Sequence, residues 1–350
     1  MALIGTFFLA CFVGACAPIG VSAERQGDVR VIELKSNAGP VGWLDNETIV
    51  AIGQTGESYA RKDGAMQPIA RVMTLNYRTG EQKLFGKISS EFCFSDGYVS
   101  YAFLDRATDE LWVSYGELGS ETTRKIKPGE LNFDRGSRGS CRPWSERPKP
   151  PSWAKENTAI WPLSPYKGLL NCNVAAATAS TQHVKARFHK PNDEQGVELP
   201  FSCYEVSMGL KYYPFKGAYF SFEFDFRIPW PAGRDRRAFW LFPDGTVETQ
   251  LLKYSTAIRA GGIPTAKGIV TFATPARAFA EPASAEADYW IYLVTPMESK
   301  RILPGHGSGV TSPDGCKVAM LHDPEYKARI NNRSVTTRVT LKVLDLCETK

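Results

Sequence analysis

A short turn signal recurs in this sequence between similar flanking residues. Asp-Gly or Asp-Asn is the pair that tolerates the left-handed dihedral angles of a tight hairpin. It occurs in four segments: residues 43–50, 94–99, 242–247 and 312–318. After the first and the last of these, a second hairpin-like segment follows at residues 73–85 and 339–347. The recurrence predicts a small β unit that is repeated along the chain.

Short β-rich runs occupy the sequence between these turns, and we find no helical periodicity beyond the N-terminal segment. The expected strands cover residues 71–77, 110–115, 218–228, 237–242, 268–273, 289–294 and 339–346. The clearest alternation lies in residues 218–228, where one face of the strand carries Phe220, Phe222, Phe224 and Phe226. The pattern predicts an all-β fold.

Two of the repeated segments resemble a known family. Ser312-Pro313-Asp314-Gly315 opens a strand, and Tyr77-Arg78-Thr79-Gly80 ends one. Both are similar to the blade pattern of TolB-type and WD-repeat-like β-propellers, and the resemblance covers about half of the chain after residue 23. It implies one propeller domain over residues 24–350, with six or seven blades of about 40–45 residues. Residues 29–34 would then close the ring beside the C-terminal strand.

A pair of β-sandwiches is the alternative fold. Such domains are also built from short alternating strands with frequent turn signals.

The first 23 residues carry no charged side chain and are mostly apolar until Pro18. Val21-Ser22-Ala23 offers small residues at a cleavage site, so we predict a signal peptide over residues 1–23 and a periplasmic or secreted protein. Val13-Gly14-Ala15-Cys16 resembles the bacterial lipobox, and acylation of Cys16 would be the only membrane attachment. An uncleaved N-terminal helix is the third option.

Six cysteines remain after this segment: Cys93, Cys141, Cys172, Cys203, Cys316 and Cys347. An exported chain meets an oxidising compartment, so disulfides are expected. The sequence does not choose among the possible connectivities, and we expect neighbours to pair: Cys93 with Cys141, Cys172 with Cys203, and Cys316 with Cys347. No pair has the spacing of a zinc site, and buried free thiols are the alternative.

Residues 134–166 interrupt the pattern of strands and turns with a high density of Pro, Trp and basic residues. Pro at this density opposes both helices and sheets, so we predict a long surface loop. Its candidate ligand-binding residues are Arg138, Arg142, Trp144, Trp153 and Trp161, because Trp faces stack on sugar rings and Arg binds anions. Alternatively, the Trp side chains pack the loop onto the domain.

Two further constellations could carry chemistry. Glu223 and Asp225 are expected roughly 7 Å apart on one face of a strand. Two carboxylates at this spacing could act as acid and base in the cleavage of a glycosidic bond. Nearby arginines, at positions 227, 234, 236 and 237, could instead neutralise them.

His306 and Ser308 lie in Gly305-His306-Gly307-Ser308-Gly309, which could form an anion nest or a nucleophilic site. We favour a flexible link between blades.

The remaining histidines, His183, His189 and His322, are dispersed without metal-ligand spacing, and no cofactor fingerprint is present. We therefore expect neither a metal nor a cofactor. The net charge of +5 is far from that of a dedicated nucleic-acid-binding protein.

These observations favour an exported, non-catalytic binding or scaffold protein that engages a protein or a glycan through propeller loops. The alternative is a secreted carbohydrate-active enzyme, a lyase or glycosidase, with carboxylate or His chemistry at the channel mouth.

Overall fold

The structure is a computed structural model of the 350-residue chain. It describes residues 15–16, 18–60, 66–88, 92–95, 97–105, 110–125, 158–163, 168–173, 184–190, 192–203, 210–223, 235–253, 257–258, 262–274, 289–326, 328 and 339–348.

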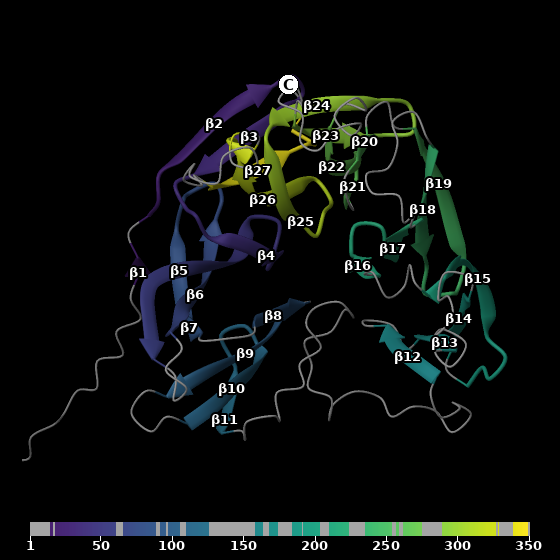
Figure 1. Cartoon of the computed structure of the whole chain (residues 1–350), viewed down its shortest axis with the longest axis horizontal. Helices are drawn as coiled ribbons and strands as arrows, with labels where there is room; N and C mark the ends of the chain where they lie inside the picture. Colours follow the sequence, from purple (N-terminus) through teal and green to yellow (C-terminus); the bar gives the residue numbers. More distant parts are fainter. Residues whose placement is uncertain are drawn as a thin grey trace, which may run out of the picture.

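In these ranges, 27 strands form six antiparallel sheets that stand as blades around a ring (Figure 1). The first blade contains β4 (Gly39–Trp43), β5 (Thr48–Ala60), β6 (Met66–Asn76) and β7 (Gln82–Ile88), with β1 (Ala15–Cys16) at its outer edge. The second contains β8 (Phe92–Ser95), β9 (Tyr98–Asp105), β10 (Glu110–Glu117) and β11 (Thr122–Lys125). The third contains β12 (Thr158–Leu163), β13 (Gly168–Asn173), β14 (Lys185–His189) and β15 (Val197–Ser202).

The other three blades complete the ring. The fourth contains β16 (Lys211–Tyr213), β17 (Ala218–Phe222), β18 (Asp235–Leu241) and β19 (Val247–Lys253). The fifth contains β20 (Ala257–Ile258), β21 (Ile263–Thr265), β22 (Gly268–Thr274), β23 (Trp290–Val294) and β24 (Ser299–Pro304). The sixth contains β25 (His306–Thr311), β26 (Lys317–Asp323), β27 (Thr340–Asp345), β3 (Val29–Leu34) and β2 (Val21–Gln26).

The fold is therefore a β-propeller, as the sequence predicted, and not a pair of sandwiches. It has six blades, the smaller of the two numbers that we predicted. All seven expected strand segments coincide with strands: β6, β10, β17, β18, β22, β23 and β27. Of residues 218–228, the strand covers those up to Phe222, and 224–228 lie outside the described residues. Phe220 and Phe222 share a face, with ring centroids 4.7 Å apart.

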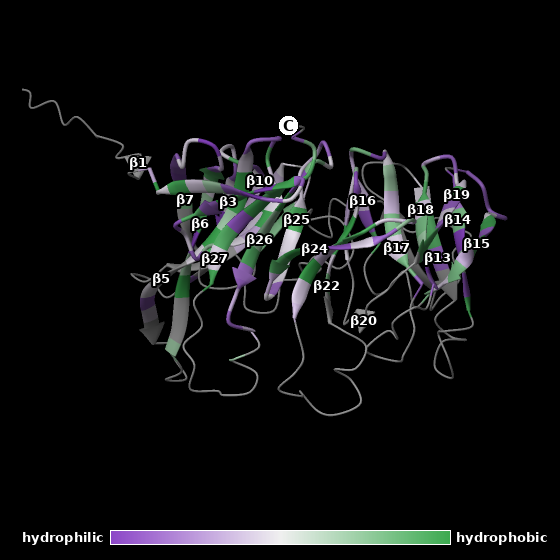
Figure 2. Ribbon diagram, turned by 90° about the horizontal axis from the view of Figure 1, so that it is seen from above, coloured by the Kyte–Doolittle hydropathy of each residue, from purple (hydrophilic) through white to green (hydrophobic). Residues whose placement is uncertain are grey.

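Each of the four predicted turns closes a hairpin: β4–β5, β8–β9, β18–β19 and β25–β26. Asp45 Oδ1 shows why the residue type matters, because it accepts the backbone amides of Glu47 and Thr48, each at 2.7 Å. Seen from the side, the turns along one rim of the ring are largely hydrophilic, whereas the strands carry most of the hydrophobic residues (Figure 2).

The hydrophobic core lies between the blades. Five clusters of buried side chains each join two adjacent blades. Blades three and four, for example, share a cluster that includes Phe201 and Phe239, whose ring centroids are 5.5 Å apart. The first, fourth, fifth and sixth blades each contribute to two of these clusters, so each of them buries apolar side chains against a neighbour on both faces.

The sixth blade closes the ring with strands from both ends of the described chain. Antiparallel β3 and β27 pair from Leu34 with Leu341 to Arg30 with Asp345, which confirms that residues 29–34 close the ring beside the C-terminal strand. Ile32 and Leu34 face the first blade, whereas Val29 and Val31 face the fifth. The period-2 pattern of this strand therefore divides its apolar residues between two interfaces.

The Ser-Pro-Asp-Gly corner between β25 and β26 links the sixth blade to both neighbours. The Asp314 amide donates to Asn46 Oδ1 in the corner of the first blade at 3.0 Å. The Gly315 carbonyl accepts the Ala266 amide of the fifth blade at 2.9 Å. Deeper in the ring, Trp43 Nε1 donates to the Val310 carbonyl at 2.9 Å.

The predicted disulfide between Cys316 and Cys347 is present, and it ties the corner of the sixth blade to the segment after β27. Cys93 and Cys203 are also disulfide-bonded. Their expected partners, Cys141 and the side chain of Cys172, lie outside the described residues, so those two pairings stay predictions.

Within the described ranges, no helix has the length and apolar character needed to cross a membrane.

Replacing Cys316 and Cys347 together by Ser should lower the free energy of unfolding. The two residues are 31 apart in sequence, and the chain-entropy model assigns about 3–4 kcal/mol to a loop of this size. Urea unfolding of the oxidised protein and of the double variant measures the difference. An unchanged unfolding midpoint would show that the bond does not restrain the ring closure.

Asp314→Asn should lower the free energy of unfolding by about 1 kcal/mol at pH 7, since hydrogen bonds to a carboxylate are worth more than neutral ones and this side chain is 30% exposed. Burial alone would raise the pKa of Asp314, but hydrogen bonds from Ser312, the Cys316 amide and Lys317 outweigh it and lower the pKa. The stabilisation is therefore complete above the unfolded pKa, about 3.9, and is lost as the pH falls through the lower folded value.

Urea unfolding at pH 7 and near pH 3 measures this effect. The difference in the free energy of unfolding between Asp314→Asn and the unmodified protein should be smaller near pH 3 than at pH 7. Asp244→Asn changes the equivalent, exposed corner of the fourth blade and serves as the control, with a smaller loss expected. A gap that widens in acid would contradict this account of Asp314.

Candidate functional site

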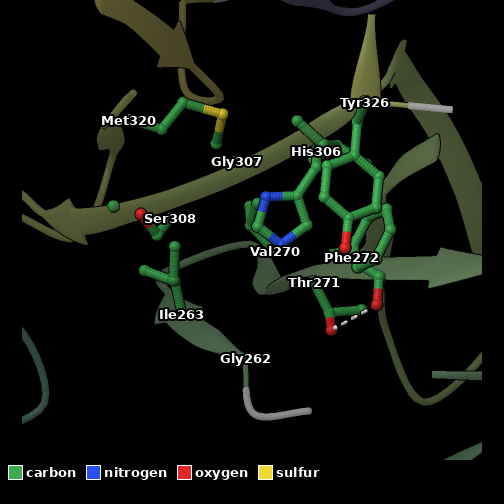
Figure 3. Close-up of a pocket in the computed structure, with 12 residues that line it drawn as sticks. Gly262, Ile263, Val270, Thr271, Phe272, His306, Gly307, Ser308, Met320 and Tyr326 are labelled. Atoms are coloured by element: carbon green, nitrogen blue, oxygen red, sulfur yellow. Dashed lines mark hydrogen bonds between the residues drawn. The ribbon is translucent and has the colours of Figure 1, made fainter. Parts of the chain in front are cut away.

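A cavity of about 330 Å³ lies between the fifth and sixth blades (Figure 3). The fifth blade and the segment before it contribute Gly262, Ile263, Val270, Thr271, Phe272 and Ile291. The sixth blade and the residues after β26 contribute His306, Gly307, Ser308, Gly309, Met320 and Tyr326. The volume is within the usual range of about 300–1,000 Å³ for small-molecule sites.

The glycine-rich segment forms one wall of this cavity. Residues 306–309 belong to β25, the first strand of the sixth blade, so the prediction of a flexible link between blades is wrong for them. The link is Gly305 alone, with φ of +109° between β24 and β25. A Cβ at Gly307 would lie 2.9 Å from Met320 Sδ and 3.3 Å from Ile291 Cδ1, so the cavity has room here only because residue 307 lacks a side chain.

Aromatic rings gather around His306, at the start of the same strand. The imidazole of His306 stacks on the Tyr326 ring, with centroids 4.5 Å apart and an interplanar angle of 20°. Its edge meets the Phe272 ring at 4.4 Å. Phe272 in turn stacks on Tyr289 at 5.6 Å, and both are buried. Packed rings of this kind hold one another in place, so the wall is preformed.

The polar side chains among the described lining residues are few, and none is a carboxylate, an amine or a guanidinium. The hydroxyl of Thr271 donates to the Phe272 carbonyl at 3.5 Å, a long bond that Figure 3 marks. Ser308 is exposed, and the nitrogens of His306 face the side where Ser308 and Ile263 lie. None of the 12 lining residues is Asp, Glu, Lys or Arg.

His306 and Ser308 both line the cavity, but their spacing does not suit nucleophilic catalysis. They occupy alternate positions on one strand, about 7 Å apart along it. A serine nucleophile and its histidine base need a hydrogen bond of about 3 Å. The two side chains therefore act as separate contacts of the cavity wall.

Glu223, one of the two carboxylates predicted as a pair, is not among the residues that line this cavity. Glu223 follows β17 in the fourth blade and forms an ion pair with Arg237, which supports the neutralised ion network that was the alternative. Arg236 lies 4.3 Å from the centroid of the Phe222 ring and donates to the Glu223 carbonyl. Asp225 lies outside the described residues.

The predicted binding loop is described only at its end. Arg138, Arg142, Trp144 and Trp153 lie outside the described residues, so their role stays a prediction. Trp161 belongs to β12, where its backbone pairs with Leu170, so the loop does not extend through residues 134–166 as predicted. Residues 159–163 are a continuous apolar run, which fits a buried strand although the segment is rich in Pro.

Two of the other histidines have structural roles. His189 Nδ1 donates to the Asp193 carbonyl at 2.9 Å, and His322 Nε2 donates to the Pro304 carbonyl at 2.8 Å. Burial lowers the pKa of His322, so it stays neutral at pH 7. His183 lies outside the described residues. No cluster of metal-binding side chains occurs within the described ranges.

The sequence did not identify Phe272, Tyr289 or Tyr326 as site residues. Phe272 and Tyr289 belong to the fifth blade and Tyr326 follows β26 of the sixth, so the three rings meet only when these blades pack together. The sequence signal that could have indicated a cavity here is the run of small residues at 307–309, because small side chains on a strand leave space next to it.

In comparisons by sequence, no protein-family model and no curated protein matches this chain. Among solved structures, it is similar to the β-propeller domain of the Trilobed protease from Pyrococcus furiosus, with 9% identity, a TM-score of 0.29, and coverage of 87% of this chain and 79% of that one. The WD40 repeats of RRP9 match with 8% identity, a TM-score of 0.33, and coverage of 93% and 99%. An oligogalacturonate lyase from Vibrio parahaemolyticus matches with 10% identity, a TM-score of 0.30, and coverage of 95% and 98%. Likeness at this level carries no argument about function, and the assignment of a propeller rests on the six sheets of the chain itself.

Proposed function

We propose that this chain is an exported, non-catalytic binding protein, and that the cavity between the fifth and sixth blades holds an uncharged sugar ring of a glycan. The observation that carries the proposal is the composition of the cavity wall. It combines the His306, Tyr326 and Phe272 rings with a strand whose glycines leave space.

This wall suits the two kinds of surface that a sugar ring presents. The apolar face of a pyranose stacks on aromatic rings, and its hydroxyls need hydrogen-bond partners at the edge. Thr271, Ser308 and the Tyr326 hydroxyl lie around the rings in Figure 3. No Lys or Arg is among the described lining residues, so this part of the wall offers an anionic sugar no fixed cationic partner.

A carbohydrate-active enzyme is the weaker candidate. Glycosidases hold two carboxyl groups on either side of the scissile bond, about 5–10 Å apart. No carboxylate is among the described residues that line the cavity, and Glu223 forms an ion pair with Arg237 in the fourth blade, away from the cavity.

The proposal also includes export from the cytoplasm and a relationship to TolB-type propellers. The Cys316–Cys347 disulfide supports an oxidising compartment, where such bonds persist. The Ser-Pro-Asp-Gly corner, whose Asp314 binds its own turn and the neighbouring blade, supports a relationship to TolB-type propellers.

Calorimetric titration with neutral oligosaccharides of glucose, xylose and N-acetylglucosamine should find a ligand, and an oligogalacturonate should not bind. His306→Ala and Tyr326→Ala should each weaken the affinity for that ligand about tenfold, equivalent to about 1.4 kcal/mol, through loss of a stacking surface. Gly307→Val, which fills the space beside Met320, should abolish binding.

Tyr115→Ala removes a half-buried tyrosine from β10 in the second blade and should leave the affinity unchanged. His306→Ala should cost only about 1 kcal/mol of stability, so that lost binding is not lost folding. The proposal fails if no neutral oligosaccharide binds, if the cavity variants bind normally, or if the bound glycan is cleaved.

A further inference from the structure

We infer that the N-terminal leader is removed at the Ala15–Cys16 bond, and that residues 18–23 belong to the mature propeller. This places the processing site upstream of the cut after Ala23 that we predict from the sequence. The inference rests on the backbone pairing and packing of these residues, and it does not depend on the proposed ligand.

The backbone of residues 19–23 is bonded to two blades. The Ile19 amide donates to the Gly80 carbonyl of the first blade, and the Lys35 amide donates to the Gly20 carbonyl, both at 2.9 Å. From Val21 onward the chain forms β2, which pairs in register with β3 along its whole length. In Figure 1, β2 lies along the outside of the sixth blade.

The side chains of this segment also contribute to the core. Ile19 and Val21 pack against the cluster shared by the sixth and first blades, which contains Leu34 and Tyr77. Gly80, with φ of +73°, is fitted to the same segment, because a Cβ there would lie 2.2 Å from the Ile19 carbonyl oxygen. The turn at Gly80 in the first blade is therefore packed closely against the backbone of Ile19.

A cut after Ala23 would divide β2 in its middle. It would remove Val21, Ser22 and Ala23 from their pairs with Leu34, Glu33 and Ile32. The second half of β3, the strand that closes the ring, would then become an unpaired edge with apolar residues, and such edges promote aggregation.

The sequence contains a second site of the same type upstream. Val13-Gly14-Ala15 carries Val and Ala at the same relative positions as Val21-Ser22-Ala23, and it directly precedes Cys16. Hydrolysis of the Ala15–Cys16 bond by a membrane-bound signal peptidase consumes one water and leaves a carboxyl group on Ala15 and an amine on Cys16. The product retains every residue from Pro18 to Gln26 that the structure places in the fold. Of the two-residue strand β1 it loses Ala15, which pairs with Lys83 at the outer edge of the first blade, and keeps Cys16, so the cut costs one edge pair rather than half of β2.

Intact-mass and N-terminal peptide measurements on the mature protein, expressed in a bacterial host with its own leader, test the inference. The expected N-terminus is Cys16, and the mass reports whether that residue also carries acyl chains. A mature chain that begins at Glu24, or an unprocessed chain that begins at Met1, would overturn the inference.

Thermal unfolding tests the physical reason separately. Chains that begin at Cys16 and at Pro18 should have the same Tm, and a chain that begins at Glu24 should have a Tm lower by about 5 °C or more. Equal Tm values for all three would show that residues 18–23 are dispensable and would also overturn the inference.

Two glycine variants localise the effect. Gly80→Ala should lower the Tm more than Gly97→Ala, whose φ is +75° but whose Cβ would have nothing within 4 Å. In the chain that begins at Glu24 the two variants should have equal effects, because Ile19 is absent. A difference that persists without Ile19 would contradict the contact on which the inference depends.

Discussion

The antiparallel pairing of β3 with β27 is the contact on which the ring depends. The first and sixth blades pack apolar side chains against each other, so a row of blades that was open between them would leave two hydrophobic surfaces in water. By combining β3 with the three strands β25–β27, the sixth blade gains a face for the fifth blade and another for the first. The disulfide between Cys316 and Cys347 and the contacts of the Asp314 corner reinforce the same junction.

The cavity is a consequence of that closure. Its glycine-rich wall is the first strand of the closing blade, and its aromatic wall combines Phe272 of the fifth blade with Tyr326, which follows β26. The two walls keep their separation because Ile291 and Met320 belong to the core cluster shared by these blades. A site built on strands of packed sheets holds its side chains more precisely than one built on loops.

Local patterns in the sequence predicted the strands, the four corners and the closing strand, because alternation and turn chemistry are properties of neighbouring residues. The sequence left the number of blades at six or seven, and the six sheets of the structure decide it. The glycines around His306 favour a link between blades when only the sequence is considered, because glycine-rich segments usually join elements. In the structure these glycines lie within β25 and leave space next to that strand. Tyr326 and Phe272 lie 54 positions apart, and no local pattern indicates that their rings meet at 5.4 Å.

Native-state hydrogen exchange of the backbone amides measures the ring closure most directly, because it reports the free energy at which each strand opens. The account predicts that amides of β3 and β27 exchange together, at the free energy of global unfolding, despite their distance in sequence. Rapid exchange of the β3 amides while β26 and β27 remain protected would show that the N-terminal strand does not close the propeller.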